Sequence, residues 1–535
     1  MDLEWYLRRL GRMTPGEVAG RVADRFNQTT LRLTAHHRKP TVVRTMPFRA
    51  PMSNLSFQGA DGVLAAADQL LEGRWTVLGV VRADMAPTPD WFLDPVSGMR
   101  APHDVFSHDI EYRDPSRVGS IKQIWELSRH HHLTVLAAAY AITGRAGYAE
   151  MSAEHLRDWW KRNPLGRGPH WISGIELGIR VISWTWIRRL LAGWSEVEGL
   201  FDLNPDFHSQ LAWHQWHLAR FSSRGSSANN HLLAEAAGQL VAATAFPWFP
   251  QSSRWAEQAR LLLEREAVVQ TFPSGLNREL ATDYHGLAME LCMVAAAEAD
   301  ASGQPLSEGF WETLRRMSDA LAAVVDVQLH PPRQGDSDDG IALLIDPGQD
   351  RWASLLATGA ALFGATGWWP ELPGTDLRTW LITGLAKPPP LAADRPSIRP
   401  DLFGDAGMVL LRTSQGETPE IWCRLDAGPH GFLSIAAHAH ADALSVEVRH
   451  DGVEVLADPG TYTYHAEPEW RSYFRSTRAH NTLELEGVDQ SVSGGPFLWT
   501  RHADTRLDKV DATKSAAASH EGYSRLEPGR LHHRT

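Results

Sequence analysis

The stretch AAHAHADALSVEVRHDGVEVLADPGTY, residues 436–462, decides how the C-terminal part of this chain folds. Apolar residues alternate with polar ones over 444–448 and again over 453–455. The pair Asp451-Gly452 between them is typical of a two-residue turn that needs positive φ. The pattern predicts a β-hairpin.

Ionisable side chains stand at both ends of this hairpin. His438 and His440 come just before the outgoing strand, and Asp458 comes just after the returning one. Two histidines two residues apart on an extended chain point the same way, and the hairpin brings the carboxylate back toward them. A further imidazole, His480, follows in the segment 475–481. The set predicts a divalent transition-metal site, with ordinary polar strand ends as the alternative.

The length and composition bound the class of protein. A chain of 535 residues is expected to hold two or three domains. The net charge of −12, without a Lys/Arg run, argues against nucleic acid as a partner but leaves an acidic polysaccharide open. The 22 tryptophans fit either a sugar-binding cleft or a large helical core.

The N-terminus predicts no export or membrane segment. Residues 1–26 are amphipathic and charged and lack the apolar core and cleavage site of a secretory signal. No run of 18 apolar residues occurs anywhere in the chain. Taken literally, this predicts a cytoplasmic protein, unless a signal has been lost.

Residues 1–100 form a lead-in with one or two helices, and residues 101–386 have a helical pattern with apolar residues three and four apart. Consecutive helices with short connections suggest helical hairpins in an array or a ring, and no repeat of fixed period is visible. The predicted helices include 133–143, 153–161, 226–245, 252–269, 286–301, 310–327, 352–364 and 377–385.

Three consecutive prolines, Pro388 to Pro390, end the helical region and mark a linker over 387–400. From residue 401 to 535 the sequence changes to strands, and it stops within this region without a natural ending, so we expect a β domain cut at its C-terminus. The predicted strands are 407–412, 420–425, 444–449, 453–457 and 481–487.

The segment SSANNHLLAE, residues 226–235, opens one of the predicted helices. Ser and Asn are common helix caps, which by itself explains them. The first turn of a helix also favours an anion, and the Asn230 amide could donate to a carboxylate there. His231 and Glu235 lie four residues apart on one face of this helix.

A second candidate segment is FPSGLNRELATDYH, residues 272–285. Tyr284 begins a helix after a turn and follows Arg278 in sequence. A nearby positive charge lowers the pKa of a phenol, so Tyr284 is a candidate proton-transfer group. A buried, hydrogen-bonded tyrosine is the structural alternative.

Three more residues are candidates for binding a substrate. Trp125 could supply a stacking ring and Arg129 an anion-binding guanidinium, or both could be helix surface. Arg475 belongs to a basic cluster near the proposed metal. The acidic segment GDSDDG, 335–340, lacks the later ligands of an EF-hand and is interpreted as a structured turn.

Taken together, these segments resemble the heparinase II/III superfamily of polysaccharide lyases, which includes oligo-alginate lyases. The resemblance covers about residues 100–535 and implies an α+β protein, an incomplete (α/α) toroid followed by an antiparallel β-sandwich. The motifs that carry it, in order, are NNHLLAEAAG, FPSGLNRELATDYH, GDSDDG, HAHADALS, DPGTYTYH and WRSYFRSTRAHNT.

The resemblance also implies roles for single residues. Asn230 matches the residue that neutralises the uronate carboxylate, and Tyr284 and His438 match the catalytic tyrosine and histidine. His440, Asp458 and His480 match the ligands of a structural zinc. His231 and Arg278 match supporting residues of the cleft.

The implied activity is cleavage of a uronic-acid-containing polysaccharide or oligosaccharide by β-elimination. Two other hypotheses stay open: a glycoside hydrolase using paired carboxylates such as Asp336 and Glu279, and a non-catalytic protein that binds acidic polysaccharide. Family members that degrade polysaccharides outside the cytoplasm normally carry a signal peptide, and none is visible here. The location therefore stays open, cytoplasmic by sequence or periplasmic by resemblance, and a role in surface-polysaccharide metabolism is possible. The sequence gives neither the glycan nor the oligomeric state.

Overall fold

A computed structural model describes the chain except for residues 1–14, 36–39, 44–45, 53, 393, 414–415, 417–418 and 512–513. The first part of the amphipathic N-terminus therefore lies outside the described residues. The described part of the lead-in contains two helices, α2 (Pro15–Thr34) and α3 (Asp61–Leu71), where one or two were expected. A small hairpin of β1 (Trp75–Val77) and β2 (Val80–Arg82) follows them.

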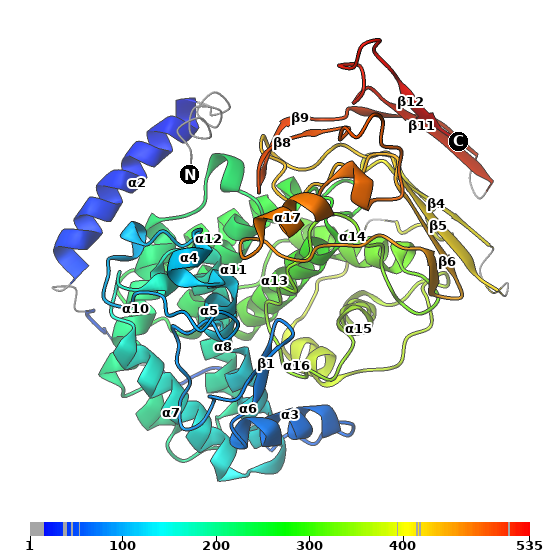
Figure 1. The fold of residues 1–535 in the computed structure, drawn as a ribbon. Helices are drawn as coiled ribbons and strands as arrows, with labels where there is room; N and C mark the ends of the chain where they lie inside the picture. The colour runs from blue at the N-terminus through cyan, green and yellow to red at the C-terminus, as the bar shows by residue number, and fades with distance from the viewer. Residues whose placement is uncertain are drawn as a thin grey trace.

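The helical region forms an open ring of helix pairs (Figure 1). Its main helices are α5 (Ile121–Leu127), α6 (His131–Thr143), α7 (Ala146–Arg162), α8 (Gly174–Leu190), α10 (Pro205–Arg220), α11 (Asn230–Ala245), α12 (Ser252–Val269), α13 (Thr282–Ala301), α14 (Glu308–Val324), α15 (Arg351–Phe363) and α16 (Leu377–Leu385). The predictions for α12 and α16 match to the residue, and most of the other predicted ends move by one to seven residues.

Helices α6, α8, α11 and α13 form the inner layer, in which each contacts the next. Their sequences are apolar or small on nearly every side, and almost every residue of α8, α11 and α13 is buried. Outer helices such as α12 keep a charged face in solvent. Helices α8 and α11 cross so closely that a Cβ at Gly238 would lie 2.4 Å from the Cα of Gly178, so both positions exclude a side chain.

The β domain contains a five-stranded antiparallel sheet in the order β3-β4-β5-β6-β7. The predicted hairpin is confirmed: β6 pairs with β7, and both Asp451 and Gly452 have positive φ. Strand β6 begins two residues later than predicted, because Leu444 has a φ of 59° that no strand adopts. The strands are β3 (Leu402–Phe403), β4 (Met408–Arg412), β5 (Ile421–Asp426), β6 (Val446–His450) and β7 (Val453–Leu456).

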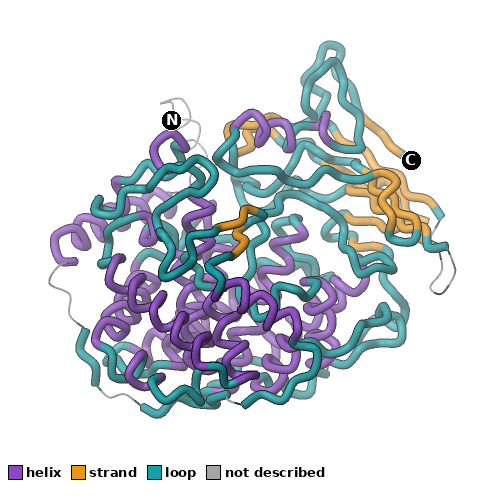
Figure 2. The backbone as a smooth tube through the Cα atoms, turned by 60° about the horizontal axis from the view of Figure 1, so that its bottom comes forward, coloured by secondary structure: helices purple, strands orange, loops and turns teal. Residues whose placement is uncertain are grey.

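A second sheet of β10 (Thr505–Asp511), β11 (Ser515–His520) and β12 (His532–Arg534) packs on the first. Ala516 and Ala518 of this sheet share a core with Val409 and Leu425, which makes a sandwich. A further pair, β8 (Val492–Gly495) and β9 (Leu498–Arg501), lies beside it. The strands of this region lie together at one side of the helical body (Figure 2).

The predicted strand at 481–487 is wrong. Within this segment Glu486 and Gly487 both have positive φ and form a tight turn that closes a single bridge between Leu485 and Val488. The described residues of 387–400, the predicted linker, form neither helix nor strand.

Most of the tryptophans fill the interior, as the core interpretation predicts. Trp159, Trp171, Trp184 and Trp186 are fully buried within the toroid. The rings of Trp159 and Trp184 pack on each other, and Trp159 and Trp171 also contact buried histidines. Within the described part of the chain, no helix is both long and apolar enough to cross a membrane.

Candidate active site

A cleft of about 570 Å³ lies where the toroid meets the β domain. The toroid contributes residues from the loop before α5 and from the starts of α8, α11 and α13, and the β domain contributes the loops around 435–438, 464–468 and 496–498. The cleft therefore gathers residues that are up to several hundred positions apart in sequence. Asn230, Tyr284 and His438 all line it, as predicted.

The cap of helix α11 leaves the Asn230 side chain for other contacts. Asn229 is the capping residue, since its side chain accepts from the backbone N–H of His231. The Asn230 amide donates to the Glu279 carboxylate at 2.9 and 3.1 Å and lies 3.4 Å from Nε2 of His438. Its Oδ1 is buried without a hydrogen-bond partner. The Glu279 carboxylate therefore holds the Asn230 amide next to His438 in the cleft.

Tyr284 and His438 meet face to face, with ring centroids 3.9 Å apart. The Tyr284 hydroxyl is 2.9 Å from the hydroxyl of Tyr464, a residue of the β domain. Burial, together with the nearby carboxylates of Asp338 and Asp336, raises the pKa of Tyr284 well above its ordinary value. The expectation that a positive charge lowers this pKa is wrong, because carboxylates rather than Arg278 are the charges near the phenol.

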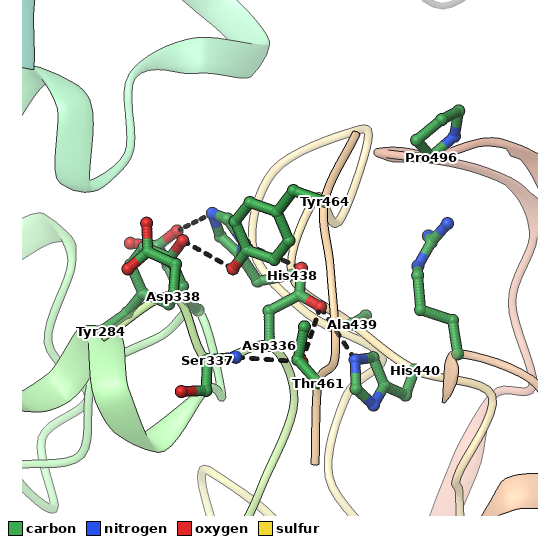
Figure 3. Close-up of polar contacts among 12 residues, drawn as sticks. Tyr284, Asp336, Ser337, Asp338, His438, Ala439, His440, Thr461, Tyr464 and Pro496 are labelled. Atoms are coloured by element: carbon green, nitrogen blue, oxygen red, sulfur yellow. Dashed lines mark hydrogen bonds and ion pairs between the residues drawn. The ribbon is translucent and has the colours of Figure 1, made fainter. Parts of the chain in front are cut away.

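A carboxylate faces each ring nitrogen of His438. Its Nδ1 lies 3.1 Å from Asp336 (Figure 3). Its Nε2 lies 3.5 Å from Glu279. Asp336 is fully buried and also bonds Nε2 of His440 at 2.9 Å and the Arg471 guanidinium. Because Asp336 accepts at Nδ1, the imidazole tautomer with its proton there leaves the Nε2 lone pair toward Asn230.

Three of the predicted substrate-binding residues line the cleft: His231, Trp125 and Arg129. Burial lowers the pKa of His231 to about 4, so the ring is neutral near pH 7. The Trp125 indole donates to the carbonyl of Pro169 and keeps its orientation through that bond. Arg129 is held by Glu176 through two bonds of 2.8 and 2.9 Å, so its charge is already neutralised within the protein.

The other two predicted substrate-binding residues, Arg278 and Arg475, are not part of the cleft lining. The Arg278 guanidinium lies over the ring of Phe272, 4.7 Å from its centroid. Arg475 is buried, stacks on Trp499 at 4.4 Å and donates to the carbonyl of Gly495. The aromatic rings nearby hold both side chains by cation–π contact, so the structure gives no support for a role of either in substrate binding.

The predicted metal ligands lie in one buried region of the β domain. His480 bonds Asp458 through Nδ1 at 2.7 Å, and its ring centroid is 5.1 Å from that of His440. Ligand atoms of Asp442, Asp458 and His480 all lie within 4.8 Å of one another. His440 directs Nε2 toward Asp336, which leaves its Nδ1 without a hydrogen-bond partner. Nε2 of His480 is also without a hydrogen-bond partner.

Sequence reasoning missed Tyr464, Lys122 and Asp442. Asp442 continues the alternation that begins with His438 and His440, so its spacing was a usable signal. Tyr464 stands in the DPGTYTYH motif, but its proximity to Tyr284 depends on how the two domains meet. Lys122 carried no signal, since its partner Asp338 is more than 200 residues away.

Two family models match the sequence: the heparinase II/III N-terminus over residues 98–354 and the heparinase II/III-like C-terminal domain over residues 395–535. The chain belongs to the heparinase II/III-like family. Among curated relatives, heparin-sulfate lyases of Bacteroides stercoris and Pedobacter heparinus are 25% and 23% identical over 72% and 69% of the chain. The chain spans 58% and 53% of those relatives, a little over half their length.

Solved structures of heparinases share the fold. A crystal structure of heparinase III matches with a TM-score of 0.60 and 16% identity, over 95% of this chain and 72% of the other. The heparan sulfate lyase HepC from Pedobacter heparinus matches with a TM-score of 0.52 and 20% identity, over 95% of this chain and 70% of the other. The predicted fold class, a toroid followed by an antiparallel β-sandwich, is confirmed.

Proposed function

We propose that this protein is a polysaccharide lyase that cleaves a uronic-acid-containing glycan by β-elimination. A base removes the proton at C5 of the uronate, the C4–O bond breaks, and the leaving oxygen takes up a proton. The product carries a C4=C5 double bond conjugated with the carboxylate, and no water is consumed.

The observation that carries the proposal is the contact between Tyr284 and His438 inside the cleft, with Asn230 beside it. One N–H of the Asn230 amide is held by Glu279, and the other donates to the uronate carboxylate and stabilises the negative charge that grows there when the C5 proton leaves. The His438 Nε2 lone pair takes that proton, because Asp336 holds the other nitrogen.

Tyr284 returns a proton to the leaving oxygen. Its raised pKa keeps the phenol protonated near neutral pH, which suits a proton donor better than a resting base. Tyr464, at 2.9 Å from the Tyr284 hydroxyl, can accept from or donate to it during the step.

The hydrolase alternative is disfavoured by where its carboxylates lie. Asp336 and Glu279 occupy opposite sides of the His438 ring instead of facing each other across a substrate. Both are nearly or fully buried, and neither lines the cleft.

The proposal includes a structural zinc ion in the β domain. Asp442, Asp458 and His480 fit a zinc ion by their donor types, and His440 offers the unpartnered Nδ1 next to them. A bound zinc would neutralise the buried carboxylates and fix the loop that carries His438. We expect one zinc per chain by mass spectrometry and its loss in His480→Ala with a lower Tm. His450→Ala, at an exposed histidine, is the matched control.

The activity is tested by absorbance near 230 nm with alginate, heparan sulfate, hyaluronan and bacterial exopolysaccharides. We expect a rise with at least one glycan, because elimination alone makes the conjugated double bond. New reducing ends without that absorbance would favour a hydrolase, and binding without cleavage of any glycan would favour the binding protein.

A further inference from the structure

A second hollow lies on the outer side of the toroid, between α10 and the start of α12. Its volume is about 720 Å³, comparable to the cleft and within the range of roughly 300–1,000 Å³ that is typical of ligand sites. Phe249 and Pro250, from the segment that joins α11 to α12, also line it. This α10–α12 groove shares no described lining residue with the cleft, so it is a separate feature of the surface.

Tryptophan and arginine side chains form both walls of the groove. On α10, Trp213, Trp216 and Arg220 are three and four residues apart and therefore lie on one face of the helix. On α12, Arg254 and Trp255 belong to the first turn. Trp213 and Trp216 are half-buried, unlike the tryptophans of the toroid core, so part of each indole lies at the surface.

The groove is positively charged although the chain as a whole is acidic. Arg220 and Arg254 are exposed, and within the described part of the chain neither forms an ion pair. The described residues of the lining include no Asp or Glu. Glu257, the acidic residue nearest to Arg254 in sequence, bonds Arg260 at 2.7 and 3.0 Å and lies outside the lining. Two guanidiniums can therefore bind an anion here, in a chain whose net charge is −12.

These groups together suit a sugar that carries a carboxylate. An indole face packs on the C–H face of a pyranose ring, and a guanidinium binds a carboxylate through two hydrogen bonds. Gln251 and Gln258 add amides that can donate to and accept from sugar hydroxyls. A neutral glycan would leave both guanidiniums without a partner. A nucleic acid usually engages more phosphates than two guanidiniums can bind.

We propose that the α10–α12 groove is a second, non-catalytic binding site for a uronate-containing glycan. Trp213 and Trp216 stack on its sugar rings, and Arg220 and Arg254 bind its carboxylates.

The position of the groove suggests what this binding does. Arg220 lines the groove and the next residue, Phe221, lines the cleft, so the two sites approach each other at the end of α10. A long polysaccharide that contacts both sites has a raised effective concentration at the cleft, with no change in the chemistry there. This consequence rests on the proposed function, whereas the binding at the groove does not.

Native gel electrophoresis through polygalacturonate or alginate tests the binding, with mobility compared to gels without polymer. Tyr284→Phe is the parent, so that cleavage does not remove the polymer. We expect at least one uronate polymer to retard the parent, and Arg220→Gln/Arg254→Gln to weaken this binding about tenfold. Arg157→Gln/Lys161→Gln removes the same charge from an exposed part of α7 and should leave binding unchanged. Equal retardation of these two double variants would overturn the proposal.

A further variant tests the stacking. Trp216→Leu keeps an apolar side chain on α10 and removes the indole face, so we expect about fivefold weaker binding. Thermal melting shows whether the variant is folded, and Trp213→Leu provides a second version if it is not. Unchanged binding in a folded variant would contradict the stacking.

Other ligands decide the chemical class of the occupant. Dextran, a neutral glycan, should not retard the parent. Equal retardation by dextran would overturn the proposal. So would binding of DNA or of phosphatidylglycerol vesicles through Arg220 and Arg254 with no uronate polymer bound, since the groove would then belong to another anion.

Chain length separates failure of this inference from failure of the proposed function. If the chain is a lyase, Arg220→Gln/Arg254→Gln should raise KM several-fold for a long polymer and leave kcat within about twofold, because only a long chain spans both sites. KM for a tetrasaccharide should stay unchanged. If no glycan is cleaved but polymer binding still depends on the two arginines, the lyase proposal fails and the groove stands. If cleavage occurs and this variant matches its control in binding and KM, the groove proposal fails and the lyase stands.

Discussion

The two faces of the cleft are built differently. On the toroid face, Asn230 and Tyr284 stand in the first turns of α11 and α13, two long helices buried along almost their whole length. On the β face, His438 and Tyr464 stand in irregular loops before β6 and after β7. The loop before β6 includes Ala436 with a φ of 45° and Leu444 with a φ of 59°.

Apolar packing positions the toroid face, whereas polar contacts position the β face. The backbone carbonyl of Ala441 accepts from both Thr477 and Gln490. Asp336, which belongs to the helical region, reaches across to His438 and Arg471. The comparison teaches that the β half of the site depends on a buried carboxylate of the other domain, so its geometry is sensitive to single polar substitutions.

The strongest test of this comparison removes the carboxylate. Asp336→Ala leaves Arg471 as a buried, unpaired cation and releases both histidines, so we expect a loss of about 3–5 kcal/mol in the free energy of unfolding. Urea denaturation measures the loss. Asp394→Ala, at an exposed position of the linker, is the control and should change stability by less than about 0.5 kcal/mol. A loss below about 1 kcal/mol for Asp336→Ala would show that the β face does not depend on it.

The second test compares the two phenols that meet across the cleft. Tyr284→Phe removes the proton donor and is expected to lower kcat at least a hundredfold, about 2.7 kcal/mol of transition-state stabilisation. Tyr464→Phe removes only a partner of that donor and is expected to lower kcat about tenfold. Initial rates near 230 nm measure both. A larger loss for Tyr464→Phe would move the donor to the β face.

The third test uses pH and concerns the toroid face alone. Burial raises the pKa of Glu235 to about 7 from an ordinary 4.5. A raised pKa means that the folded state favours the protonated form of Glu235. The contribution of this group to the free energy of unfolding is therefore fully present below pH 4.5 and is lost as pH rises through 7. Glu235→Gln should match wild type near pH 5 and be about 2 kcal/mol more stable, relative to it, near pH 8. Urea denaturation at each pH measures the free energy of unfolding of both proteins. A difference between them that stays constant from about pH 5 to about pH 8 would contradict the raised pKa of Glu235.

The smallest effect is expected at Arg278, and it tests whether this residue belongs to the toroid face of the cleft. Arg278→Ala loses a cation–π contact with Phe272, which we expect to cost about 0.5–1 kcal/mol of stability. Because the side chain does not line the cleft, kcat/KM should stay within about twofold of wild type. A large rise in KM would return Arg278 to the substrate-binding residues.

Much of the fold was predictable, since it depends on local signals. Apolar periodicity located α12 and α16 to the residue, and Asp451-Gly452 located the turn of the hairpin. The strand predicted at 481–487 failed because its alternation is interrupted by a turn at Glu486-Gly487, which the pattern did not reveal.

The sequence by itself determined that helices carry Asn230 and Tyr284, although both predicted starts are four residues off, and it determined the hairpin that follows His438. Periodicity and turns act over a few residues, so local sequence is enough for them. Only the tertiary structure decided that Arg278 and Arg475 stack on aromatic rings away from the cleft. It also decided which carboxylate faces each nitrogen of His438. The physical reason is that side-chain direction, pKa and charge pairing depend on tertiary packing. Asp336 and Glu279 meet His438 from more than a hundred residues away, and short-range sequence patterns carry no information on such contacts.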